Sequence, residues 1–453
     1  MNERTKELAE LPIRRLMLKF FIPAFIGVFI NALYNIVDRI FIGQGVGSMA
    51  LSGVSVTFPV MLIVMGFGML IGIGSGVLVS INLGKRDMKK SEQVLGTGFL
   101  LMLLVSVLIT VIGFSLKNIM LHSFGATAET IQYANDYLDI ILAGTVFQVV
   151  GFSLNNIIRA EGNPRIAMGS MIISAGTNMI LNPIFIFGFG WGVKGSAYAT
   201  VISMVVLTIW VLVHFQSSKS VVKLKAENIR FDRKILLEIL AIGMAPFFMQ
   251  IANSIVQGLI NTKLIAYGGD LAVGAMGIVN SVLTLIVMAI VAINMASQPI
   301  ISYNYGAKSF ARVKETLRIA SIMATVIAVF AFVMVESFPE TIVKLFNSKD
   351  DGLLSFGKEG LRLCVLALPF VGFQVVAGNF FQSMGKARIA VLLTLLRQVI
   401  ILIPLLFILP NFFGLHGIWM AMPISDLCSA IVVVFFLVNQ WKKLNILAEA
   451  NRI

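Results

Sequence analysis

The sequence predicts an all-α integral membrane protein of twelve transmembrane helices, arranged as two pseudo-symmetric lobes of six helices each. Three observations lead to this prediction. The 453 residues are 58% hydrophobic and 13% charged, with a mean hydropathy of +0.93, whereas soluble proteins carry about 25% charged residues. The apolar residues fall into runs long enough to cross a bilayer. The second half of the chain also repeats the first half in register.

Twelve stretches of the sequence are apolar enough to cross a bilayer, whose core needs a helix of about 20 apolar residues. They lie near residues 16–43, 50–81, 94–116, 131–157, 166–188, 195–215, 236–265, 271–302, 316–338, 360–384, 388–410 and 415–440. Prolines such as Pro23, Pro246 and Pro423 lie within these stretches. We expect bent helices there, because a proline removes a backbone donor.

The distribution of Lys and Arg predicts how these helices cross the membrane. Most of the 35 basic residues lie at the termini or in the even-numbered connections, for example in KRDMKK (85–90) and AKSFARVKETLR (307–318). Basic loops remain on the cytoplasmic side, so we expect both termini to be cytoplasmic. The net charge of +13 is spread over these short loops, and we therefore expect no nucleic-acid partner.

The sequence offers little to support an enzyme. Cys364 and Cys428 lie in apolar runs, and the three histidines stand far apart. We find no HExxH motif, no GxSxG motif and no phosphate-binding loop. We therefore expect no enzymatic activity, no catalytic residue, no cofactor and no structural metal.

The internal repeat is weak but extends over the whole half. The matched pairs share an offset of 222 or 223 residues and include Pro23 with Pro246, LIVM at 62–65 with LIVM at 285–288, and GNPRIA at 162–167 with GKARIA at 385–390. The repeat predicts an N-terminal lobe at 1–218, a cytoplasmic linker at 219–235 and a C-terminal lobe at 236–453. Parallel repeats of this kind are typical of transporters with a central cleft between their lobes.

One polar stripe crosses the first apolar stretch, within NALYNIVDRIFIG (31–43). Asn31, Tyr34, Asn35 and Asp38 recur at helical spacing and therefore share one face. A charge at the bilayer centre costs about 2.5–3.5 kcal/mol, so a carboxylate there needs a partner or a water-filled cavity. Asp38 is thus the first candidate for a functional residue.

Further polar residues on the fourth, fifth and sixth stretches could complete a site around Asp38. These are Gln148, Asn155, Asn156, Asn178, Asn182, Thr200 and Ser203. A carboxylate with neutral oxygen ligands can hold a proton or a small monovalent cation such as Na⁺. In the repeat, the partners of Asp38, Asn178 and Asn182 are Asn261, Ile401 and Leu405. The asymmetry indicates a specific task in the N-terminal lobe, because packing is a demand common to both lobes.

Two structural alternatives remain open at this point. Asp38 could form a buried ion pair with Arg39 or with Arg397, although neighbouring residues on a helix do not face each other. Asp426, in the last stretch, is a second intramembrane acid that Arg397 could also neutralise.

Aromatic, methionine and glutamine side chains of the C-terminal half suggest the wall of a substrate cleft. Methionine adapts to many ligand shapes, and aromatic faces attract organic cations. The candidate cleft residues are Phe247, Met249, Gln250, Gln257, Phe370, Gln374 and Phe380. Packing and lipid contact are the alternative roles for these residues.

Four motifs together resemble a known family. NIVDRIFIG (35–43), RAEGNPR (159–165), NMILNPIFIFG (178–188) and GSAYATVIS (195–203) are similar to the multidrug and toxic compound extrusion (MATE) family, most closely to its bacterial MepA-like branch. The resemblance covers the whole chain. It implies a V-shaped, twelve-helix antiporter in a bacterial cell membrane, a monomer by default, which exports organic and often cationic drugs in exchange for protons or sodium ions.

The resemblance also implies roles for particular residues. Asp38 matches the aspartate that binds the coupling cation in many members, and Asn178, Asn182 and Thr200 match its supporting positions. The family often has an aspartate in place of Asn182, so this chain has one titratable group fewer. A lipid-linked saccharide flippase of the same superfamily is the alternative, although it would need a more basic cleft. A non-transporting membrane scaffold is a third possibility.

Overall fold

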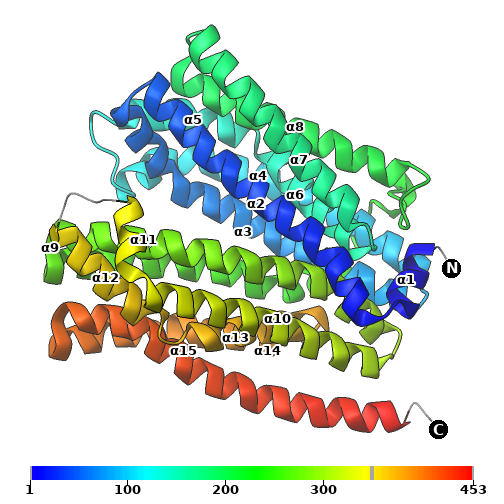
Figure 1. Ribbon diagram of the computed structural model, residues 1–453. Coiled ribbons are helices and arrows are strands. Elements are labelled where there is room, and N and C mark those ends of the chain that lie inside the picture. Colours follow the sequence, from blue (N-terminus) through cyan, green and yellow to red (C-terminus); the bar gives the residue numbers. More distant parts are fainter. Residues whose placement is uncertain (1–2, 347–350, 451–453) are drawn as a thin grey trace. The chain divides into compact units, whose positions relative to one another are not determined.

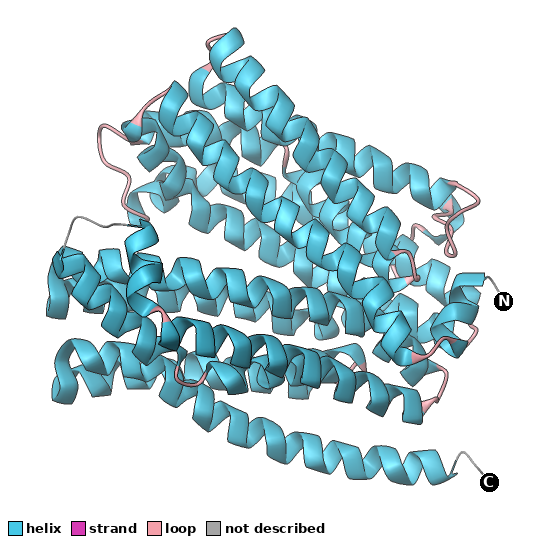
Figure 2. Ribbon diagram, viewed as in Figure 1, coloured by secondary structure: helices cyan, strands magenta, loops and turns pink. Residues whose placement is uncertain are grey.

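The computed structural model describes residues 3–346 and 351–450, and within these ranges it contains helices and connections but no strand (Figures 1 and 2). The chain forms two compact units. The first comprises Met1–Leu11 and Ile22–Phe247, and the second comprises Pro12–Phe21 and Phe248–Ile453. Each unit is described by itself below.

The first unit is an antiparallel succession of long helices. Its elements are α1 (Glu3–Glu10), α2 (Ile13–Gly45), α3 (Ser48–Gly84), α4 (Met88–Ser123), α5 (Ile131–Ala143), α6 (Thr145–Ala160), α7 (Pro164–Pro183), the π-helix η1 (Ile184–Gly188), α8 (Gly192–Gln216) and the 3₁₀ turn η2 (Ala226–Asn228). The beginning of α2 lies in the second unit, and the start of the next helix, α9, lies in the first.

The second unit has the same plan. Its elements are α9 (Arg233–Gly306), α10 (Phe310–Ser337), α11 (Pro339–Phe346), α12 (Asp351–Val365), α13 (Leu368–Ser383), α14 (Ala387–Leu395), the π-helix η3 (Leu396–Leu402) and α15 (Ile403–Ala450). α9 is broken at Gly269 and α15 at Gly414, both with positive φ. Each of these two helices therefore consists of two helical segments, one before and one after the glycine.

The helices confirm the predicted fold class. In the described residues, nine helices are long and apolar enough to span a membrane, and counting the two bent pairs as spans raises the number to eleven. The last of the nine, Ala387–Glu449, is 63 residues long and is broken at Gly414 (φ 54°). Since about 20 residues suffice for one crossing, this run holds two spans, and the total is twelve.

Two sharp bends lie between consecutive helices, whereas Pro23 lies within α2, which continues from Ile13 to Gly45. The α5–α6 pair bends by 56° and the α12–α13 pair by 50°. Gly144 lies at the first bend, where an added Cβ would stand 2.6 Å from Cγ2 of Val201 on α8. The bend therefore coincides with a close helix approach that only glycine permits.

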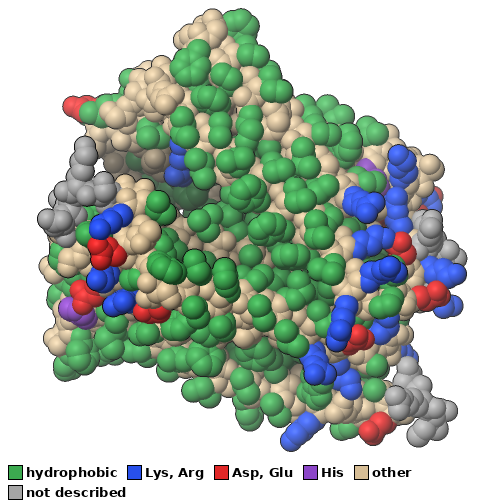
Figure 3. Space-filling model, viewed as in Figure 1, with side chains coloured by type: hydrophobic (Ala, Val, Ile, Leu, Met, Phe, Trp, Pro, Cys, Tyr) green, Lys and Arg blue, Asp and Glu red, His purple; other side chains and the backbone are tan. Residues whose placement is uncertain are grey.

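The outer surface carries the apolar side chains that lipid requires. Ile119, Phe330 and Phe435 are each more than 60% exposed. Figure 3 shows hydrophobic side chains over most of the visible face, with most of the visible Lys and Arg gathered toward its right and left edges. So large an apolar surface is unfavourable in water and suits contact with lipid. The protein is therefore a multi-pass membrane protein.

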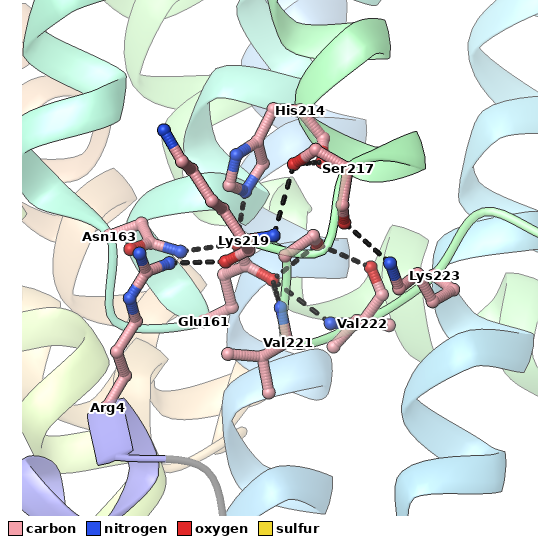
Figure 4. A network of polar contacts seen from close by, with 10 residues as sticks. Arg4, Glu161, Asn163, His214, Ser217, Lys219, Val221, Val222 and Lys223 are labelled. Atoms are coloured by element: carbon pink, nitrogen blue, oxygen red, sulfur yellow. Dashed lines mark hydrogen bonds and ion pairs between the residues drawn. The ribbon is translucent and has the colours of Figure 1, made fainter.

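The linker begins with a network built on the buried carboxylate of Glu161 (Figure 4). Glu161 lies in the turn between α6 and α7 and is 0% exposed. Its Oε2 accepts from the backbone N–H of Val221 (2.9 Å) and of Val222 (3.1 Å) and from Ser220 Oγ (3.0 Å). Its Oε1 lies 2.5 Å from His214 Nε2. The chain after α8 is thereby held to the first unit.

The rest of the linker packs along α4. Thr97 Oγ1 donates to the backbone carbonyl of Arg230 (3.2 Å), and Lys225 Nζ lies 2.7 Å from Glu92 Oε2. The Glu92 carboxylate raises the pKa of Lys225. The sequence assigned residues 219–235 to a linker between lobes, and the structure adds that this segment belongs to the first unit.

Candidate functional site

Asp38 lies in the second half of α2 and is 9% exposed. Its Oδ1 accepts a hydrogen bond from Ser196 Oγ at 2.7 Å and another from Asn182 Nδ2. Asn182 stands at the end of α7, directly before Pro183 and the π-helix η1, and Ser196 lies near the start of α8. Three helices therefore meet at this carboxylate.

A chain of polar contacts continues from Asp38 along α7 and α8. Asn182 Nδ2 lies 3.5 Å from Asn178 Oδ1, and Asn178 Nδ2 donates to Thr200 Oγ1 at 3.1 Å. Ser203 Oγ donates to the backbone carbonyl of Thr200 at 2.7 Å. The structure thus brings together Asp38, Asn178, Asn182 and Thr200, as the sequence predicted. Their part in ion coupling stays a prediction.

Two residues of this cluster were not predicted from the sequence. Ser196 precedes Thr200 by four residues and therefore lies on the same face of α8, a signal that GSAYATVIS already contained. Tyr137 on α5 is 3% exposed and interacts with Thr200, Asp38 and Tyr34. Nothing in the sequence around Tyr137 pointed to this site, because only the tertiary fold brings α5 beside α2.

The four residues predicted to support the site have different surroundings. Tyr34 lies close enough to Asp38 to interact with it electrostatically. Asn35 is exposed and donates to the backbone carbonyl of Asn31 at 2.7 Å. The Oε1 atom of Gln148 is buried without a hydrogen-bond partner among the described residues.

The prediction that Asn155 supports the site around Asp38 is wrong, because Asn155 belongs to a separate network. Its Nδ2 donates to Ser170 Oγ (2.6 Å) and to the carbonyl of Ala167 (2.9 Å), and its Oδ1 accepts from Arg159 (2.6 Å). Arg159 is only 6% exposed, and a buried guanidinium needs acceptors. One helical turn on α6 places Asn155 within its reach, so the amide serves Arg159.

The alternative of a buried ion pair between Asp38 and Arg397 is wrong. Arg397 Nε lies 2.5 Å from Asp426 Oδ1, and both residues belong to the second unit. The guanidinium of Arg39 lies over the ring of Phe58, 5.4 Å from its centroid. Asp38 is therefore held chiefly by neutral donors.

The oxygen atoms around Asp38 suit a small cation. Besides the carboxylate, the cluster has the hydroxyls of Ser196 and Thr200 and the Oδ1 atom of Asn182, which is buried and has no hydrogen-bond partner among the described residues. Such an oxygen set can take a proton on the carboxylate or coordinate Na⁺. A buried acceptor without a donor is costly, and a cation would remove this cost.

The residues predicted to form a substrate cleft differ in their exposure. Met249, Gln257 and Phe370 are exposed, and Gln250 is half-buried. Phe247 packs against Phe67 within the first unit, with ring centroids 4.8 Å apart.

Two of the predicted cleft residues are buried in the second unit. Gln374 donates to Ser429 Oγ at 2.5 Å, and Phe380 is 1% exposed and packs on Phe381. The prediction that Phe380 lines an open cleft is wrong for this conformation, because neighbouring helices enclose its ring.

A helical membrane protein with a duplicated half and with acids buried among its membrane-spanning helices belongs, in its architecture, to the class of secondary transporters. Comparison with known proteins identifies the family. The MatE family model matches residues 23–184 and 245–408, one stretch in each half, and the chain therefore belongs to the MatE family.

Curated relatives and solved structures agree with this family. The chain is 30% identical to "Multidrug export protein MepA" of Staphylococcus aureus strain MSSA476 over 429 residues, 94% of each chain, and 29% identical to the MepA protein of Staphylococcus saprophyticus over 426 residues, 93% of each. The solved structure of the MATE multidrug transporter DinF-BH is 38% identical, with a TM-score of 0.88 over 94% of this chain and 95% of that one.

Proposed function

We propose that this protein is a multidrug exporter of the bacterial cell membrane. It expels organic, often cationic, drugs in exchange for protons or sodium ions by alternating access. The export proteins named MepA and the multidrug transporter DinF-BH support the drug class, since each matches this chain over more than nine-tenths of its length. The protein changes the position of its substrate and not its covalent structure, so we expect no enzymatic step and no cofactor besides the coupling ion.

The buried carboxylate of Asp38 is the observation that carries the coupling. Drug export against a gradient requires an ion whose binding biases the two access states differently. Asp38 is joined to α7 by Asn182 and to α8 by Ser196. When Asp38 takes up a proton or Na⁺, its Oδ1 becomes a weaker acceptor for both donors. Ion binding would thereby change how α2 is held against α7 and α8.

The test is drug efflux from cells that carry the native chain or Asp38→Asn at matched expression. Cells are loaded with ethidium, and efflux is followed by fluorescence, with a protonophore and a sodium-free buffer in parallel. Asp139→Asn is the matched control, because Asp139 is a half-exposed carboxylate that pairs with Lys117 at 2.5 Å and makes none of the hydrogen bonds described for the polar cluster. We expect Asp38→Asn to abolish gradient-driven efflux and Asp139→Asn to retain it.

Either result is informative. Loss of efflux in Asp38→Asn alone supports coupling at this carboxylate, and the protonophore and sodium arms distinguish the two ions. Undiminished efflux in Asp38→Asn would show that the carboxylate is structural. If the native chain exported none of several dyes, multidrug export would be refuted, and a lipid-linked substrate would be tested next.

A further inference from the structure

We propose that the guanidinium of Arg397 is a fixed counter-ion of Asp426, the buried acid of the second unit. The guanidinium thereby keeps this carboxylate from taking up a proton. The proposal rests on the proposed function, because it assigns the exchanged ion to the first unit alone. It also gives a role to Arg397 and Asp426, two intramembrane charges that lie outside the site around Asp38.

The pair lies inside the second unit. Asp426 lies on α15 and is 6% exposed, and Arg397 lies on the π-helix η3. Arg397 Nε donates to Asp426 Oδ1 at 2.5 Å. Arginine stays protonated in proteins and its guanidinium matches a carboxylate in shape, so this counter-ion cannot leave by losing its proton.

Neighbouring contacts fix the segment that carries Arg397. Ser425 Oγ donates to the backbone carbonyl of Arg397 at 2.7 Å, and Gln398 Nε2 donates to Asn253 Oδ1 of α9 at 2.9 Å. A π-helix leaves the regular hydrogen-bond pattern, and such segments occur frequently at functional sites. The contacts place the guanidinium at the acid and hold it there.

Among the described residues, Arg397 is the charged group that acts on Asp426, and two neutral polar groups lie nearby. Gln374 bonds to Ser429, which follows Asp426 by one turn, and Gln374 Oε1 is buried without a partner among the described residues. Cys364 on α12 is a buried thiol that interacts electrostatically with Asp426. Without Arg397, this would be an acid among neutral polar groups, as Asp38 is in the first unit.

The repeat shows that the corresponding helix crossing of the first unit carries neither of these two charges. Ser174 aligns with Arg397 at the offset of 223, and Ser203 with Ser425 at the offset of 222. In the first unit, Ser174 Oγ donates to the carbonyl of Ser203 at 3.1 Å. In the second unit, the equivalent positions meet again, through Ser425 and the carbonyl of Arg397.

Asp426 itself aligns with Met204 at the offset of 222. The second unit therefore has Arg and Asp where the first has Ser and Met. A buried ion pair is often no more stabilising than apolar side chains of similar volume. Stability alone therefore does not explain the charges. A fixed counter-ion at Asp426, in contrast, would keep this carboxylate from taking up a proton in a protein that exchanges its ion at Asp38.

The test counts the carboxyl groups that take up a proton in the purified full-length protein. Infrared difference spectra between about pH 8.5 and pH 6 report the C=O stretch of protonated carboxyls, above the range in which exposed Asp and Glu titrate. Native protein is compared with Arg397→Gln, Arg397→Lys and the double variant Arg397→Gln/Asp426→Asn. We expect one additional protonated carboxyl in Arg397→Gln, and no additional one in Arg397→Lys or in the double variant.

A folded Arg397→Gln protein without the additional carboxyl would overturn the proposal, and so would an additional carboxyl that persists in the double variant. Should Arg397→Gln fail to fold, the same infrared measurement on Asp426→Asn in the otherwise native chain tests whether Asp426 takes up a proton. It must leave the native number of protonating carboxyls unchanged, and loss of one contradicts the proposal. The count needs no transport, so a failure of drug efflux would refute the proposed function separately.

Discussion

At the scale of single residues, the chemistry of Asp38 in the first span depends on the neutral groups that donate hydrogen bonds to it. Asp38 accepts hydrogen bonds from Ser196 and Asn182 through the same oxygen atom. The alternative ion pair with Arg397 does not form, because Arg397 pairs with Asp426. A carboxylate held by neutral groups can exchange a proton or Na⁺, whereas one held by a guanidinium is neutralised permanently. We propose that Asp38 and Asp426 are these two cases within one chain.

Ser196 gives a prediction at this scale. Release of the coupling ion leaves a charged carboxylate, and Ser196→Ala removes one of the two donors that stabilise it. A hydrogen bond to a charged group contributes about 1.5–3 kcal/mol, equivalent to about tenfold or more in an equilibrium. We therefore expect ethidium efflux to slow by about tenfold or more while the protein still folds.

Ser115→Ala is the matched control for Ser196→Ala. Ser115 is exposed on α4 and donates to the carbonyl of Val111 in its own helix. Equal efflux rates in Ser196→Ala and Ser115→Ala would mean that the hydroxyl of Ser196 does not contribute to coupling.

At the scale of elements, the connection between the two halves begins as part of the first unit. The backbone of Val221 and Val222 is bound by Glu161, and Arg230 is bound by Thr97 on α4. Asn228 approaches α4 so closely that a Cβ on Gly96 would stand 2.1 Å from its carbonyl oxygen. Residues 220–230 are thus held to the first unit, and we call this segment the strap.

Glu161→Gln tests this strap. The amide has one acceptor oxygen where the carboxylate has two, so part of the donor set of Figure 4 loses its acceptor. An unsatisfied buried donor costs about 1–3 kcal/mol. We expect faster trypsin cleavage after Lys219, Lys223 and Lys225, measured by limited proteolysis in detergent.

Glu227→Gln is the control for Glu161→Gln, because Glu227 is an exposed residue of the same linker. Cleavage of Glu161→Gln at the rate of this control would contradict the role of Glu161 in holding the strap.

At the scale of the whole molecule, the positive charge predicts how the chain crosses the membrane. We expect the basic connection at residues 85–90 to be cytoplasmic and the connection after α4 to face the outside. The test places single cysteines at Lys89 and Ala128, both exposed, in a chain with Cys364→Ala and Cys428→Ser. A membrane-impermeant maleimide should label Ala128→Cys in intact cells, and Lys89→Cys only in inside-out vesicles.

The opposite labelling pattern would invert the proposed orientation. Labelling of both cysteines after the membrane is permeabilised is the control for their accessibility. The result also decides on which side of the membrane Glu161 and the strap lie, since both follow an even-numbered span.

The sequence by itself determined the membrane class, the twelve spans, the repeat and the choice of Asp38, Asn178, Asn182 and Thr200 as candidate site residues. These features are local or periodic: a bilayer demands about 20 apolar residues for each crossing, and a charge within such a run is costly. Both signals can be read along a single chain.

Only the tertiary structure decided which polar groups meet. Ser196 and Tyr137 join Asp38, Asn155 serves Arg159, and Arg397 pairs with Asp426. Helical periodicity gives the face on which a side chain lies but not the helix that packs against it. The choice of partner depends on helix crossings and breaks, such as the close approach at Gly144, and these are set by contacts between residues far apart in the sequence.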